Sequence, residues 1–149
     1  MTLTLTDPRP PSPADLAATS PAARRAAERL AALLAPARLA DGDRFRVEYT
    51  RAVCASGMTP NTRLVALVLA SHGNYRTGHI PTRLQPRLQG LAEGTGLAVP
   101  QVVVALRALE QRGWVSCTGG RDYDRGDLRP HIPQHAVTTL RRRAPKNGK

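Results

Sequence analysis

The side chains best suited to specific chemistry in this 149-residue chain lie on one face of a predicted helix over residues 99–112. At about 100° per residue, Val102, Leu106 and Leu109 fall on one side of that helix and define its buried face. The opposite face carries Pro100, Gln101, Val104, Arg107, Ala108 and Gln111. A glutamine amide can pair with adenine, an arginine with guanine or a phosphate, and a valine can touch a thymine methyl. These residue types favour contact with base edges in a nucleic-acid groove.

Further candidate contacts precede and follow this helix. Several arginines lie on or near the two preceding helices, and one is the last residue of the helix itself. Three more flank a glycine-rich turn, which has a tyrosine at its expected tip. The set consists of Arg63, Arg83, Arg87, Thr95, Arg112, Arg121, Tyr123, Arg125 and Arg129. Asp122, Asp124 and Asp127 alternate with the arginines of the turn. Local ion pairing is therefore the alternative for that segment.

The charge balance points to a polyanionic partner. The chain has 22 Lys+Arg against 11 Asp+Glu, a formal net charge of +11, and 20 of its cations are arginine. Most of the excess lies after Thr59. A GC-rich genome would also favour arginine, but it does not explain why residues 59–115 hold so few acidic side chains. A basic excess gathered in one region is typical of nucleic-acid binding proteins.

Short local signals predict the elements that position these side chains. Thr59 and Pro60 are suited to the first positions of a helix, and Thr82-x-x-Gln85 reads as a capping box for the next one. Gly96 suits a tight turn, and Gly113 ends the third helix. The predicted order is helices over 59–72, from 82 or 86 to 94, and over 99–112, then strands at 114–118 and 128–132.

The two ends of the chain are expected to behave differently from this centre. Residues 1–20 are rich in proline and predict a disordered segment. Residues 21–38 predict a helix whose apolar stripe would either form a dimer or pack on the chain's own domain. The alternation after Arg44 fits a strand or the entry to a helix. Residues 136–149 predict a basic, solvated tail, which would either add sequence-independent affinity or serve solubility.

The stretch from Leu91 to Val115 resembles the bacterial winged helix-turn-helix DNA-binding families. Small Ala92 allows two helices to cross closely, Gly96 forms the turn, and Leu97 fills the gap between the helices. When the preceding helix is included, the resemblance covers roughly residues 45–133. This longer stretch is similar to the helix-turn-helix domains of phage and plasmid regulators and replication proteins. It implies a mainly α fold with a small β-hairpin, namely a winged helix-turn-helix domain over 44–135 with an added N-terminal helix.

In the families that it resembles, the third helix enters the major groove with its N-terminus first, and the wing reaches phosphates or the minor groove. This chain departs from the usual pattern at two points. Ala98 stands where a hydroxyl N-cap is common, and three consecutive valines, 102–104, stand among the expected base-reading positions. The alternative is a helix face that packs on another protein.

The sequence therefore predicts a sequence-specific binder of double-stranded DNA that acts as a transcriptional regulator by occupying an operator site. A homodimer would match a two-fold site. Two alternatives stay open at this point: a protein-interaction module, and a replication or partition component of a mobile element.

Other classes of function lack a signal. Cys54 and Cys117 form no CxxC pair, and the four histidines do not combine with them at zinc spacing. Phosphate-loop, nucleophile-elbow and metalloprotease motifs are absent. No enzymatic activity, cofactor or metal is expected, and no small-molecule effector can be identified. Because the chain has neither a long apolar run nor a leader, we expect no membrane contact and a cytoplasmic, nucleoid-associated protein.

Overall fold

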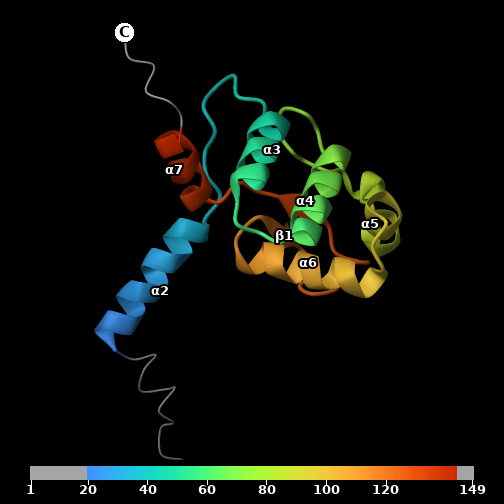
Figure 1. Ribbon diagram of the computed structural model, residues 1–149. Helices are drawn as coiled ribbons and strands as arrows, with labels where there is room; N and C mark the ends of the chain where they lie inside the picture. The colour runs from blue at the N-terminus through green and yellow to red at the C-terminus, as the bar shows by residue number, and fades with distance from the viewer. Residues whose placement is uncertain (1–19, 144–149) are drawn as a thin grey trace, which may run out of the picture. The chain divides into compact units, whose positions relative to one another are not determined.

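The computed structural model describes residues 20–143, with side chains to residue 142 (Figure 1). Residues up to Ala32 and residues from Leu33 onward form two separate units. The first unit holds most of helix α2, Pro21–Leu34, which has no buried residue. It is shorter than the expected 21–38, because Pro36 disfavours the helical conformation at the residue before it. The expected disordered segment lies, apart from Ser20, outside the described residues, and the dimer helix stays a prediction.

The second unit is mainly helical, with one small antiparallel strand pair, as predicted. Its elements in chain order are α3 (Phe45–Ala55), α4 (Pro60–His72), the 3-10 turn η1 (Thr82–Leu84), α5 (Arg87–Thr95), α6 (Val99–Gln111), β1 (Val115–Cys117), β2 (Leu128–Pro130) and α7 (Gln134–Arg143). None of the helices in the described part of the chain is both long and apolar enough to cross a membrane.

The region after Arg44, ambiguous from its sequence, is helical. Phe45, Tyr49, Ala52 and Val53 are the buried residues of α3, and they recur at the spacing of one helix face. Val47, which completes the apparent alternation, lies on the exposed side. The alternation was thus a coincidence of three residues inside a helical pattern.

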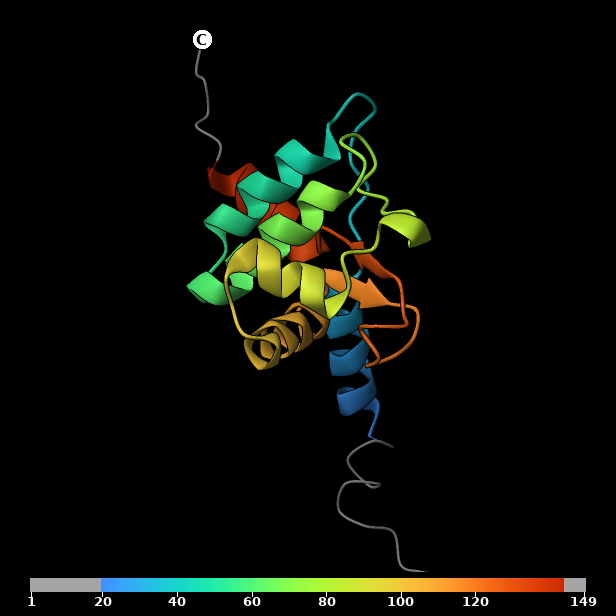
Figure 2. The ribbon, with the colours of Figure 1, turned by 90° about the vertical axis from the view of Figure 1, so that its right-hand side faces the viewer.

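The core forms where α4, α5 and α6 pack together, with α3 on the other side of α4 (Figures 1 and 2). Leucine, valine and alanine supply most of it, as the composition predicts. A short aromatic series completes it: the Tyr49 ring stacks on Phe45 at 5.3 Å and meets Trp114 edge-on at 5.8 Å. Such pairs add to the free energy gained by burying their area. They tie α3 to the start of β1.

Two glycines set the position of α6. Gly96 caps α5 with φ of +73°, which lets the chain turn into α6 after only three residues. Gly113 follows α6 with φ of +75°, and a Cβ at this position would meet the carbonyl oxygen of Leu34. Both are backbone conformations that other residues resist. The expected turn and helix end are confirmed.

The hairpin and the C-terminal segment complete the unit. β1 and β2 pair with Ser116 opposite Arg129, and an isolated bridge joins Pro36 to Pro133. The expectation of a solvated tail from residue 136 is wrong for its first part. Residues 134–143 form α7, which packs against α3 and buries Ala136. An apolar row of Ala136, Val137 and Leu140 drives this packing, and the arginine run after it hid that row in the sequence.

Candidate nucleic-acid interface

The predicted outward face of α6 is exposed in the structure. Pro100, Gln101, Arg107 and Gln111 are exposed, Ala108 is half-buried, and Val104 is 66% exposed. On the inner side Val102, Leu106 and Leu109 are fully buried. The division into two faces, made from helical spacing alone, is confirmed. One side of α6 is anchored in the core while the other is available to a partner.

A shallow groove runs between this face and the start of α4. It is lined by Thr59, Asn61, Thr62, Pro100, Gln101, Val104 and Ala105. No charged side chain is among these lining residues, so the N-terminal half of the interface is apolar and hydroxyl-rich. The position of Asn61 here has no signal in the sequence, because it depends on how α4 crosses α6.

The amide of Gln101 has a structural role at the start of α6. Its Oε1 accepts a hydrogen bond from the backbone N–H of Ala98 at 3.0 Å. This is the reciprocal half of a capping box, present although alanine replaces the usual hydroxyl residue. A bidentate pair with adenine would need this oxygen as well as the amide N–H. Gln101 can therefore read a base with both groups only by giving up this cap.

Tyr123 is not at the exposed tip of the hairpin, and its expected contact with DNA is corrected by the structure. Its side chain is 3% exposed, and its hydroxyl donates to Oε2 of Glu110 on α6 at 2.5 Å. Burial, this hydrogen bond and the negative charge of Glu110 all raise the pKa of Tyr123, while nearby Arg107 lowers it. Tyr123 is a core residue that joins the hairpin to α6. It also accounts for Glu110, the one acidic residue of that helix.

The aspartates of the hairpin hold it against the start of α5. Asp124 Oδ1 accepts from the backbone N–H of Leu88 at 3.1 Å. Asp127 pairs with Arg87 at 3.5 Å, and Arg87 also donates to the carbonyl of Gly126 at 2.9 Å. Arg87 has a left-handed φ of +56°, which is costly for a residue with a Cβ and is held here by these contacts. Arg87, predicted as a DNA contact, is thus paired with the hairpin.

Within the hairpin, Asp122 holds the turn together. Its Oδ1 accepts from the backbone N–H groups of Asp124 and Arg125, and its Oδ2 lies 3.7 Å from Nε of Arg125. Arg125 is thus also paired within the chain. Arg121 and Arg129 are exposed, and the described ion pairs of residues 20–142 do not include them. Only these two hairpin arginines keep their charge available.

The remaining predicted contacts are spread over several elements. Arg63 on α4 is half-buried, and Arg83 in η1 is exposed. Thr95 turns its hydroxyl inward, where it donates to the carbonyl of Leu91 at 2.6 Å. Arg112, just after α6, is exposed and lines a cavity beside Trp114. The predicted residues on the outward side of α6 thus share one face, whereas the predicted arginines lie on several different elements.

Gln85 is a structural residue whose signal was misread. It was expected to close a capping box with Thr82, but it is buried instead. Its Nε2 donates to the carbonyls of Ile80 at 3.1 Å and Leu128 at 3.0 Å, and its Oε1 accepts from the N–H of Leu128 at 3.0 Å. The side chain thereby completes the edge of β2. Thr82 turns to Asp127 of the hairpin, 45 residues away.

Comparisons of this chain with protein-family models, with curated proteins and with solved structures find no match. A function for the chain therefore has to come from its own geometry.

Proposed function

We propose that this protein binds double-stranded DNA through the outward face of α6, as a winged helix-turn-helix regulator of transcription. In this proposal α5, the turn at Gly96 and α6 form the helix-turn-helix, and the β1–β2 hairpin is the wing. The observation that carries the proposal is the position of α6. It is fixed in the core along one side and, after a three-residue turn, presents an uncovered face along the other.

The charges around α6 support a DNA partner. Arg107 lies on the exposed face, and the acidic Glu110 is engaged by Tyr123. Arg121 and Arg129 of the hairpin are exposed and would contact phosphates or the minor groove. The hairpin is held against α5 by its aspartates, so its position relative to α6 is preset. A preset wing lowers the entropy lost on binding.

The proposal is tested by selecting bound sequences from a random pool of duplexes and measuring affinity at low and at physiological salt. We expect one enriched motif and binding that persists at physiological salt. Uniform weak binding that disappears at physiological salt would overturn specific recognition. Val104→Glu should weaken binding at least about tenfold by placing a carboxylate against the duplex. Val47→Glu is the matched control, since Val47 is an exposed valine on α3.

A second candidate function follows from the apolar groove beside Val104. A groove without charged lining residues also suits a protein partner, in which case α6 would belong to a protein-interaction module. This function predicts no measurable DNA affinity together with a co-purifying partner that Val104→Glu removes and Val47→Glu retains. A role in replication or partition would use the same DNA contacts and would be recognised by the location of the selected motif in the genome.

A further inference from the structure

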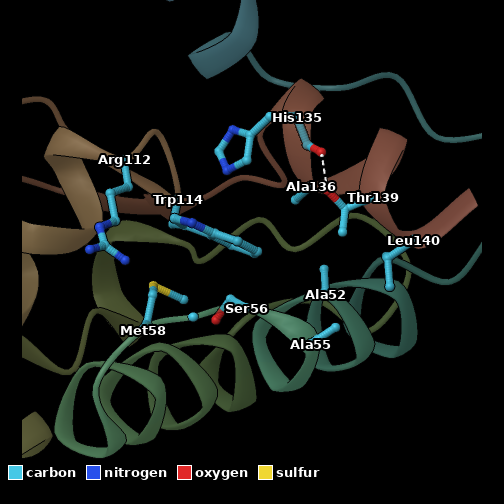
Figure 3. Close-up of a pocket in the computed structure, with 11 residues that line it drawn as sticks. Ala52, Ala55, Ser56, Met58, Arg112, Trp114, His135, Ala136, Thr139 and Leu140 are labelled. Carbon is cyan, nitrogen blue, oxygen red and sulfur yellow. Dashed lines mark hydrogen bonds between the residues drawn. The ribbon is translucent and has the colours of Figure 1, made fainter. Parts of the chain in front are cut away.

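A cavity opens beside the end of α6, where the chain leaves the helix at Arg112 (Figure 3). Its volume is about 270 Å³. The end of α3, the connection to α4, the start of β1 and one side of α7 enclose it. Ala52, Met58, Arg112, Trp114, His135 and Thr139 are among the residues that line it. The cavity is therefore built from three segments that are distant in sequence, namely residues 52–58, 112–114 and 135–140.

The lining of this cavity is divided about equally between polar and apolar surface. Trp114 is 2% exposed and Met58 is buried, so each presents only a small apolar edge to the cavity. The imidazole of His135 meets the indole edge-on at 6.3 Å. Nδ1 of His135 lies 3.1 Å from the carbonyl oxygen of Leu33, which fixes the orientation of the ring. A lining that mixes apolar edges with polar groups suits a small ligand that has an apolar body and one polar group.

Two donors at the cavity have no acceptor in the described chain. No described residue accepts a hydrogen bond from the indole N–H of Trp114. Among residues 20–142, Nε of Arg46 is the one side-chain nitrogen that is fully buried and has no partner. The indole nitrogen of Trp114 also has no partner, so it is not fully buried and keeps some contact with solvent. Trp114 is otherwise enclosed, and it lines this cavity. Buried tryptophans usually satisfy this N–H, so an unfilled acceptor position is indicated.

The second donor is the guanidinium of Arg112. The ion pairs found among the described residues do not include it, and no aspartate or glutamate is among the described residues that line the cavity. An arginine that lines a cavity without a carboxylate partner can bind an anion there. One unpaired cation corresponds to one negative charge on a ligand.

We propose that this cavity binds a small organic monocarboxylate. The apolar body of the ligand packs on Trp114 and Met58, and its carboxylate accepts hydrogen bonds from Arg112 and from the indole N–H. The ligand is small, because the cavity volume lies at the lower end of the range for ligand sites. Phenylacetate has a suitable size and charge and serves as the probe.

The chain contains its own reporter for this site, because Trp114 is its single tryptophan. Phenylacetate is titrated into the full-length protein, without DNA, while tryptophan emission is recorded. We expect a saturable change with Kd on the order of a millimolar or tighter. Phenylacetamide has the same shape without the charge, and it should bind at least about tenfold more weakly. A linear response, or equal responses to the acid and the amide, would overturn the proposal.

Two neighbouring threonines of α7 give a matched pair of variants. Thr139 lines the cavity and Thr138 does not, and each hydroxyl bonds a carbonyl one turn earlier, at 3.0 and 3.1 Å. Thr139→Phe should fill the cavity and abolish the saturable change, while Thr138→Phe should preserve it. Equal behaviour of the two variants would contradict the site. Arg112→Gln should weaken binding of phenylacetate at least about tenfold and leave phenylacetamide unaffected.

This experiment is independent of the DNA proposal, since the emission of Trp114 is read on the protein alone. A positive titration with no DNA affinity would leave a ligand-binding protein of another kind. DNA binding without a saturable titration would remove the ligand site and keep the proposed function.

Discussion

The hydroxyl of Tyr123 and the carboxylate of Glu110 form a 2.5 Å hydrogen bond that joins the hairpin to α6. The two residues are 13 positions apart, on either side of β1. This bond occupies the one acidic group of α6 and buries a tyrosine in a segment made mostly of glycine, aspartate and arginine. It thereby fixes the hairpin to the helix whose face we propose to bind DNA.

Tyr123→Phe should lower the free energy of unfolding by about 1–3 kcal/mol, because it leaves the Glu110 carboxylate without its donor. Urea denaturation followed by circular dichroism measures this change. Tyr75→Phe is the control, since Tyr75 is 42% exposed and its ring lies under the guanidinium groups of Arg44 and Arg46. Its change should stay within about 0.5 kcal/mol. Equal effects of the two substitutions would show that the bond does not stabilise the hairpin.

Gln85→Met should destabilise the fold by about 3 kcal/mol, because the N–H and C=O of Leu128 lose their partner in a buried position. Gln89→Met on α5 is the matched control. The Gln89 amide is exposed and donates only to Glu93, so its loss should change stability by less than about 0.5 kcal/mol. The midpoints of urea denaturation for both variants decide the matter. A Gln85 variant as stable as the wild type would mean that water replaces the side chain.

Substitutions of Gln101 can separate its cap from its proposed contact with a base. Gln101→Ala removes the acceptor for the Ala98 N–H and should lower stability by about 1 kcal/mol. Gln101→Glu keeps an acceptor and adds a negative charge near the helix N-terminus, so its stability should equal or exceed that of the wild type. Both variants should lose DNA affinity. Full affinity in the glutamate variant would limit Gln101 to the cap.

Arg107 and the arginines of α7 should affect DNA binding differently. Arg107→Ala should weaken discrimination between the selected motif and other sequences by about 1–3 kcal/mol. Substituting Arg141 and Arg142, both exposed, should lower affinity for all duplexes alike and reduce the salt dependence. Affinity measured against matched and mismatched duplexes at several salt concentrations distinguishes these effects. If the Arg107 variant still prefers the selected motif over other sequences to the same extent, then other residues of α6 must recognise the bases.

The stability of the fold should depend on pH through His131. Burial and then the positive charge of Arg129 hold the pKa of His131 below its ordinary value of 6.5. Just below pH 6.5 the unfolded chain therefore binds more protons than the folded one, so stability falls as the pH is lowered from 6.5 towards the folded pKa. His131→Asn should flatten this part of the profile, measured by urea denaturation at a series of pH values. The exposed His79 provides the control: His79→Asn should retain the wild-type slope.

The start of α4, the ends of α5 and α6 and the two faces of α6 could be predicted from the sequence because their signals are local. Thr59 accepts from the N–H of Thr62, and Gly96 and Gly113 adopt the left-handed conformation, each within a few residues of the helix that it delimits. The burial of Val102, Leu106 and Leu109 follows from helical periodicity, which depends only on spacing. The exposed face of α6 was therefore determined by the sequence itself.

The roles of Tyr123, Gln85 and Arg87 were decided by the tertiary structure alone. Each makes its contacts with a segment that is distant along the chain, and periodicity carries no information about such partners. The same applies to α7, whose apolar row is buried only because it packs against α3, and to the cavity at Trp114, which three separate segments enclose. The periodic spacing of apolar residues along a helix predicts which side chains are buried. The partner that each side chain contacts depends on how the elements pack.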